Sequence, residues 1–342
     1  MATMDVFSGS AFSLLELTDA INKVPYQPSF LGSLGIFEPR PVRTDHFAVE
    51  EKNGTLALIQ SSQRGAPLEQ RAGELRKVRR FNTVRLAKGD RLQASEIQSI
   101  RAFGSESEFQ AVQTEVMTRM TRLRADLELT LENMRLGAIF GEVLDADATS
   151  IYNWFTEFGI SQAAEVDFDL DNASPASGAV RTKCNGIVRA MRRAALGGWV
   201  DGRTSVLGLC GDTFFDQLVA HSEVRATYLN QVAASDLRTE AAFSELSYGG
   251  IRFVNYRGTD DDSTLSVGTL KCKFIPVGGN GVFQQAMSPG ESFDLVNTPG
   301  QPFYGLTVPD PTVRNAYVDV EVYSYPMFVC TRPGMLLRAK NT

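Results

Sequence analysis

The strongest pattern of apolar positions along the chain lies between residues 105 and 138. Apolar side chains recur there at steps of three and four, close to the period of about 3.6 residues of an α-helix with one buried stripe. Ser105 and Glu108 have the spacing of a capping box. Gly137 and Gly141 are candidates for the residue that ends this helix. The pattern predicts a helix over 105–138, roughly 45–50 Å long, which suits the spine of a domain. A coiled coil is disfavoured, because the flanking charged heptads are absent.

The first 47 residues predict a short amphipathic helix over 12–24 followed by an extended arm. Prolines gather in this arm, and proline fixes φ and biases the preceding residue toward extended geometry. The apolar segment PSFLGSLGIFEPRPV, residues 28–42, is interrupted by Gly and Pro, so it cannot build a core of its own. It must lie either on the body of the same chain or on a neighbour.

The sequence of residues 48–92 predicts a long two-stranded hairpin, with strands over 55–60 and 81–86 and a polar, Gly-containing connection. An isolated hairpin of this kind is only marginally stable in water. Two interpretations therefore remain open. The segment is either a loose surface loop or an arm that docks on another subunit.

The rest of the chain mixes short helices and strands. Residues 142–160 predict a hairpin, followed by the alternating run VDFDLD at 166–171. Helices are predicted over 180–196 and 214–221, and strands over 251–256, 270–275 and 317–323. The sequence thus predicts an α+β fold with two folded parts, one long helix and two extended arms.

Composition narrows the function classes. The 342 residues are 43% hydrophobic and 22% charged, which is typical of a folded chain, and the formal charge is −6. A mildly acidic chain argues against nucleic acid as the main partner. Only two histidines are present, so the chain has few of the residues that most often bind metal ions or transfer protons in catalysis. Neither a signal peptide nor a membrane span is predicted. The four cysteines form no C-x-x-C pair, so we expect free, mostly buried thiols and synthesis in a reducing cytoplasm.

Three motifs imitate chemical sites, and each has a simpler structural explanation. The segment GGWVDGRT at 197–204 resembles a phosphate loop but follows a helix instead of a strand, which favours a helix-ending turn. Asp167, Asp169 and Asp171 have the spacing of a calcium loop. That loop also needs a glycine and a carboxylate at later positions, so a strand with solvated carboxylates is favoured. His221 follows an apolar run at a predicted helix end. We expect no catalytic residue, no metal and no cofactor.

The charges are unevenly distributed. Residues 71–91 contain eight basic and two acidic residues, whereas residues 142–171 contain eight acids and no Lys or Arg. Two solvated faces would explain this polarity, and so would complementary electrostatics between copies of the chain. Contact of the basic segment with nucleic acid is a third possibility, although few aromatic residues interleave with it for base stacking.

An ordered series of segments resembles a known family. In chain order they are RLQASEIQSIRAFGSE, GEVLDADATSIYNWFTEFGI, VLGLCGDTFFDQLVAHSEVRATY, FSELSYGGIRFVNYRG, FIPVGGNGVF, FDLVNTPGQPFYG and VEVYSYPMFVCTRPGMLLR. They resemble the lambda-type major capsid protein E family of tailed bacteriophages, which has the Hong Kong 97-type capsid fold. The resemblance runs from about residue 20 to the end.

The resemblance implies a division of the chain into structural parts. These are an N-terminal arm (1–47), an extended loop (48–92), a peripheral domain with the spine helix (93–179), an axial domain (180–312) and a C-terminal strand returning to the peripheral domain (313–342). Some relatives carry a long N-terminal scaffolding extension. Here the spine helix begins near residue 105, so we expect a separate scaffold protein. We find no Lys–Asn crosslinking pair, which favours stabilisation by a decoration protein.

The function implied is structural. Copies would form pentamers and hexamers that close into the icosahedral head of a tailed phage, assembled in the host bacterial cytoplasm. The head would carry a portal and enclose double-stranded DNA without sequence-specific binding or a membrane. Two other classes stay open: an α+β enzyme or ligand-binding protein, and a non-capsid assembly such as a tail tube or a cellular encapsulating shell. We further predict that the basic segment contacts the acidic segment of an adjacent subunit, through Arg71, Arg76, Lys77, Arg79, Arg80, Asp145 and Asp147.

Overall fold

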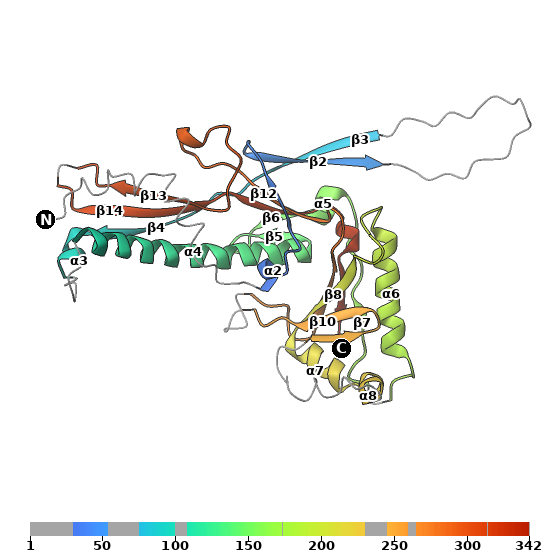
Figure 1. The fold of residues 1–342 in the computed structure, drawn as a ribbon. Helices are drawn as coiled ribbons and strands as arrows, with labels where there is room; N and C mark the ends of the chain where they lie inside the picture. The colour runs from blue at the N-terminus through green and yellow to red at the C-terminus, as the bar shows by residue number, and fades with distance from the viewer. Residues whose placement is uncertain are drawn as a thin grey trace, which may run out of the picture.

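The structure, a computed structural model, describes residues 30–53, 75–99, 108–172, 174–229, 245–258, 265–312 and 314–341. The helix predicted over 12–24 and the strand predicted over 55–60 lie outside these ranges. The spine helix α4 (Glu108–Phe140) forms one arm of the molecule, and a six-stranded sheet with three helices hangs from one end of it (Figure 1).

The helix α4 forms for the reason its sequence suggested. Its apolar stripe from Val112 to Ala138 is buried, and it packs against the three-stranded sheet β13–β14–β4. These strands are β13 (Tyr304–Pro309), β14 (Tyr317–Ser324) and β4 (Leu86–Gln93). Strand β14 alternates strictly between buried and half-buried residues, which confirms the prediction for 317–323. Helix and sheet thus bury each other's apolar face.

A glycine ends the spine helix. The helix continues through Gly137 and ends at Phe140, and Gly141 takes a φ of +91°. A Cβ at Gly141 would overlap the ring of Phe155, so both the backbone conformation and the space require glycine. Of the two predicted stops, only Gly141 is correct.

The second sheet has the order β7–β16–β11–β8–β10–β9. Its strands are β7 (Val166–Asp167), β16 (Leu337–Lys340), β11 (Lys271–Val277), β8 (Ser205–Cys210), β10 (Ile251–Asn255) and β9 (Glu245–Tyr248). Helices α6 (Ala179–Ala194), α7 (Asp212–Ala220) and α8 (Ser222–Leu229) accompany it (Figure 1). Helices predicted over 180–196 and 214–221 are therefore confirmed, as are the strands at 251–256 and 270–275, within one or two residues at each end. All four cysteines are free and buried, as predicted.

A third sheet, β1–β12–β15, holds the N-terminal arm on the body. Its strands are β1 (Glu38–Pro41), β12 (Phe283–Met287) and β15 (Pro326–Cys330), and β1 pairs in parallel with β12. The ring of Phe37 lies between those of Phe283 and Phe328, with centroid distances of 5.2 and 5.1 Å. Of the two interpretations of the apolar segment, residues 30–42 thus follow the first: they lie on their own chain.

A buried ion-pair cluster joins this arm to the spine helix. In the short helix α2 (Phe30–Ser33), the Leu31 N–H donates to Glu132 Oε1 at 2.7 Å. Glu132 also pairs with Arg135 at 3.3 Å, and both side chains are buried. Burial raises the pKa of the neighbouring Glu128, although Arg135 and Arg124 act against that shift. Pairing within the cluster therefore offsets only part of the desolvation of its charges.

Three expectations are wrong in detail. Residues 81–86 are not one strand: β3 (Leu75–Asn82) ends at Asn82, and β4 begins at Leu86 in another sheet. Residues 142–160 start as the predicted hairpin, β5 (Glu142–Leu144) with β6 (Ser150–Asn153), but continue as helix α5 (Trp154–Phe158), which Asn153 caps. Residues 313–342 form three strands in three different sheets, because the 3-10 turn η5 (Pro333–Met335) and Pro326 interrupt them.

Candidate assembly surfaces

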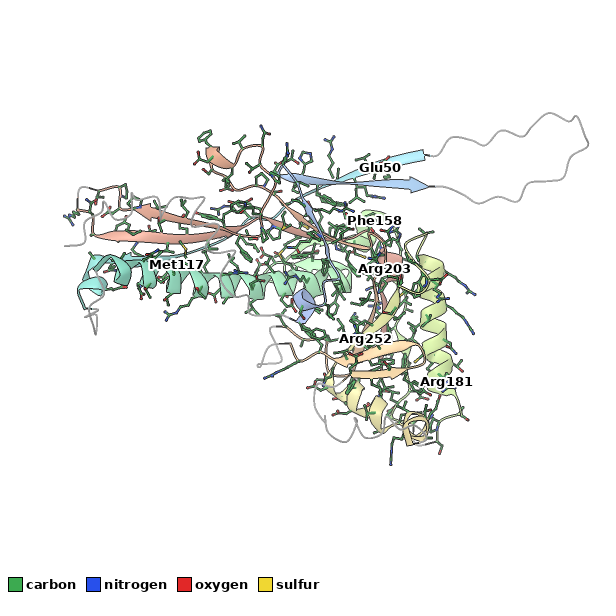
Figure 2. The ribbon with its side chains drawn as sticks, in the orientation of Figure 1. Glu50, Met117, Phe158, Arg181, Arg203 and Arg252 are labelled. Atoms are coloured by element: carbon green, nitrogen blue, oxygen red, sulfur yellow. The ribbon has the colours of Figure 1, made fainter. Side chains whose placement is uncertain are left out.

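The hairpin of β2 (His46–Asn53) and β3 extends away from the body (Figure 1). Its root is fixed by Phe81, which is buried against Tyr152, Trp154 and Phe158, with ring centroids 5.2–6.2 Å away. The Asn82 N–H donates to the Tyr152 hydroxyl at 3.0 Å. Figure 2 labels Glu50 on the projecting hairpin and Phe158 beneath it in this view. The hairpin is thus held at one end and presented to its surroundings at the other.

The structure places the predicted basic residues in different environments. Arg79 points toward the body: its guanidinium donates to the Glu157 carbonyl and lies 5.0 Å over the ring of Phe158. Lys77 and Arg80 are exposed. The side chain of Arg76 and all of Arg71 lie outside the described part of the chain. Arg79 therefore belongs to the root of the hairpin, and Lys77 and Arg80 to its exposed portion.

The predicted acidic partners lie on the exposed turn between β5 and β6. The Asp145 carboxylate accepts from the Ala146 N–H at 2.7 Å. Asp147 accepts from the Thr149 hydroxyl at 2.6 Å and from its N–H at 3.0 Å, and these bonds lower the pKa of Asp147. Both carboxylates are thus fixed in direction and open to solvent.

Sequence reasoning missed a third exposed feature, on the loop 288–303 between β12 and β13. Phe293 is 97% exposed and Val296 is 61% exposed, and the acidic residues Glu291 and Asp294 are exposed beside them. We call these four residues the knob. Between the two apolar residues, Leu295 is buried against Tyr304 and Tyr325. A run such as FDLV does not reveal which residues turn inward, so the sequence alone carried no signal for the knob.

The motifs that imitate chemical sites have structural roles here. Phe168 and Leu170 are buried, while Asp169 and Asp171 are exposed, as predicted. The predicted strand is wrong beyond Asp167, however, because β7 covers only Val166–Asp167 and Asp169 takes a φ of +51°. Residues 197–204 form turns after α6. His221 is buried, and its Nδ1 accepts from the Glu223 N–H at 3.3 Å. Within the described ranges, no cluster of three or more His, Cys, Asp or Glu is placed to hold a metal ion.

A shallow pocket of about 500 Å³ lies where the N-terminus of α6 meets α8, near Arg181 (Figure 2). The Glu223 carboxylate in its wall accepts from the N–H groups of Val180 and Arg181 and from the Tyr248 hydroxyl at 2.6 Å. Burial acts to raise the pKa of Glu223, but these hydrogen bonds lower it overall. The carboxylate therefore clamps two helices and a strand together. In the portion of the chain described, no helix is long and apolar enough to cross a membrane.

Sequence comparisons match the chain to one protein family and to named relatives. A family model described as phage major capsid protein E matches residues 13–341. The major capsid protein of Salmonella phage Felix O1 is 24% identical over 358 residues, covering 96% of each chain. That of Pseudomonas phage KPP10 is 25% identical over 351 residues, covering 96% of this chain and 97% of the relative.

Two solved structures show the likeness of fold. A putative capsid protein of an E. coli CFT073 prophage has a TM-score of 0.53 at 13% identity, covering 96% of this chain and 99% of that one. The capsid protein of a native GTA particle has a TM-score of 0.51 at 13% identity, covering 93% and 92%. The architecture in Figure 1 is therefore that of a capsid protein.

Proposed function

The chain belongs to the phage major capsid protein E family, and we propose that its copies form pentamers and hexamers that close into an icosahedral head around double-stranded DNA. Its fold is the Hong Kong 97-type capsid fold, and its role in the phage shell is structural and not enzymatic, which confirms the expectations from the sequence. The finer features of assembly are our proposal. The observation that supports this proposal is the hairpin β2–β3, because a pair of strands that extends away from its own subunit gains stability from contact with a neighbouring copy.

The proposed division of the chain into parts follows the sheets only in outline. In the proposed extended loop (48–92) the hairpin β2–β3 projects from the body, whereas the described end of the proposed arm (1–47) pairs with β12 on the body. The proposed peripheral part (93–179) is built on α4. The proposed axial part (180–312) supplies β8, β9, β10 and β11 of the six-stranded sheet, but also β12 and β13 of the other two sheets. The end of the extended loop that forms β4 lies in the sheet beside α4, which supports grouping it with the peripheral part. The C-terminal segment (313–342) contributes β14 to that sheet and β16 to the six-stranded sheet, which supports a role in joining the peripheral and axial parts. Heterologous contacts that close into rings suit such a subunit.

Other partners complete the proposal. A separate scaffold protein, a decoration protein and a portal would act with the shell, and assembly would take place in the host bacterial cytoplasm. The net charge of −6 supports a shell that does not bind its DNA tightly, because packaged DNA has to slide.

Negative-stain microscopy of the purified protein tests this function. Rings of five and six subunits or closed icosahedral shells support it. Tubes would favour a tail-type assembly, and dispersed monomers at high concentration would favour the enzyme or ligand-binding alternative.

We also propose a charged contact between neighbours, from the basic segment with Arg71, Arg76, Lys77, Arg79 and Arg80 to Asp145 and Asp147. The exposure of Lys77 and Arg80 and the fixed, exposed aspartates support it. Because Arg79 already contacts its own chain, it strengthens the root and is a poor target for the test.

The better test is the double reversal Lys77→Glu with Arg80→Glu, which we expect to reduce shell yield strongly. The neutral pair Lys77→Gln with Arg80→Gln is the matched control and should have a weaker effect. Reversal of Asp145 and Asp147 to Lys should partly restore assembly. Normal particles from the double reversal alone would contradict the contact.

A further inference from the structure

The knob is built to stay exposed. Phe293 is the most exposed large apolar side chain among the described residues, at 97%. A single exposed apolar residue is ordinary on a protein surface, but here Val296 lies on the same loop and is 61% exposed. Glu291 already pairs with Arg85 of its own chain at 3.1 Å, so Asp294 is the carboxylate that the knob offers beside its two apolar side chains. An apolar centre with a charged edge is the composition of a small interface.

The loop that carries the knob is anchored at both ends and in its middle. Ser288 donates from its hydroxyl to the Thr44 carbonyl at 2.7 Å, and its N–H donates to the Tyr325 carbonyl at 3.0 Å. The Gly300 N–H donates to the Val42 carbonyl at 2.9 Å. In the middle, Leu295 is buried and the Thr298 hydroxyl donates to its carbonyl at 2.6 Å. A loop fixed in this way presents Phe293 with little further entropy to lose on binding.

A matching surface lies on the projecting hairpin. Because side chains alternate along β3, Arg79 and Phe81 face the body, whereas Val78 and Arg80 face away from it. Val78 is 58% exposed, and Arg80 is exposed two residues along the same face. This face, an apolar residue next to a cation, complements a knob with apolar residues next to the carboxylate of Asp294.

The positions of the two features suit a head-to-tail contact. The orange loop that carries the knob rises from the same side of the molecule as the hairpin, and the hairpin extends in the direction away from it (Figure 1). A neighbour placed behind the first copy can thus lay its hairpin over the knob. The same relation then repeats from copy to copy, as a closed ring of identical subunits requires.

We infer that the knob of one copy docks on the outward face of the β2–β3 hairpin of a neighbouring copy, with Phe293 and Val296 against Val78 and Asp294 facing Arg80. The inference rests on the proposed function, since it needs copies arranged in rings. It gives Arg80 a different partner from the Asp145 and Asp147 of the charged contact proposed above, because Val78 and Arg80 share one face of β3 and Lys77 lies on the other.

Photocrosslinking identifies the partner directly. Phe293 is replaced by the photoreactive p-benzoylphenylalanine, and rings or shells are irradiated, digested and analysed by mass spectrometry. A crosslink between residue 293 of one copy and residues 77–80 of another supports the inference. A crosslink to any other segment, or within a single copy, overturns it. Copies mixed with isotope-labelled protein separate the two kinds of product.

Substitution measures the contribution of the contact. The Phe293→Ser variant should raise the protein concentration needed for assembly by tenfold or more, as expected for an apolar anchor at an interface. Phe293→Leu, which keeps an apolar side chain, should recover most of the loss. The melting temperature of unassembled subunits should be the same for both variants, because the side chain is exposed. Unchanged assembly of Phe293→Ser, in a protein whose wild type forms shells, would refute the knob contact alone. Absence of shells from the wild type would refute the proposed function instead.

Discussion

The root of the hairpin offers the sharpest test of how this subunit is built. Phe81 is 1% exposed and contacts the edges or faces of three aromatic rings, two of them in edge-to-face geometry. Burial of a phenylalanine contributes about 1.5–3 kcal/mol, and each well-placed aromatic pair about 0.5–1.5 kcal/mol more. The Phe81→Ala variant should therefore lose roughly 3–5 kcal/mol of unfolding free energy, since the cavity cannot fully collapse among rigid rings.

Urea unfolding of the isolated subunit measures this loss, with Trp154 as the reporter because its ring lies 5.2 Å from that of Phe81. Val78→Ala on the same strand is the control, and it should change the unfolding free energy by less than about 0.5 kcal/mol. Phe81→Ala should also lower shell yield, because the hairpin would no longer be held in direction. A loss below about 1 kcal/mol, or one equal to that of the control, would refute the assignment of Phe81 as the anchor.

Three further predictions follow from the structure. Gly141→Ala should destabilise the subunit by about 2–4 kcal/mol, measured by urea unfolding, because its Cβ would overlap Phe155; Gly159→Ala, with a similar φ but open space, should cost only about 1 kcal/mol. The folded state lowers the pKa of Glu223, so its contribution is present above the unfolded value of about 4.3 and is lost as the pH falls through the folded pKa. Glu223→Gln should therefore flatten the pH dependence of stability below about pH 5, and an unchanged profile would contradict the clamp. Burial raises the pKa of the Cys184 thiol to about 12, so that thiol should resist a disulfide reagent at pH 8 until the chain unfolds.

The helices and strands that could be predicted from the sequence are those that bury one apolar face, because such a face leaves a periodic pattern of apolar residues. The helix α4 and the strand β14 belong to this class, because a stripe at period 3.6 or strict alternation is a local signal. The buried, free cysteines followed from composition and spacing. Fold class and capsid function came from the ordered series of family segments, since no single site carries them.

Elements defined by distant partners could not be predicted. Residues 83–85 break the expected return strand, because the Thr83 N–H bonds to the Asp45 carbonyl and the Val84 N–H bonds to Pro326, each at 3.0 Å. Nothing in the local run FNTVRL shows those two bonds. The contact of Arg79 with Glu157 joins the basic and acidic segments within one chain, whereas charge counting treated both as surfaces for a neighbour. The knob was missed for a related reason: only tertiary packing decides that Leu295 turns inward and Phe293 outward.

The order in which the strands enter their sheets has a consequence for synthesis. Strand β14 is central in the sheet beside α4, β15 closes the sheet that holds the arm, and β16 lies inside the six-stranded sheet. A nascent chain in which residues 317–340 are still inside the ribosome therefore lacks a strand in each of these sheets. Neither part can complete its core before these residues emerge. The subunit should consequently become competent to meet its neighbours only after residues 317–340 have left the ribosome, which separates the folding of each copy from its incorporation into a growing shell.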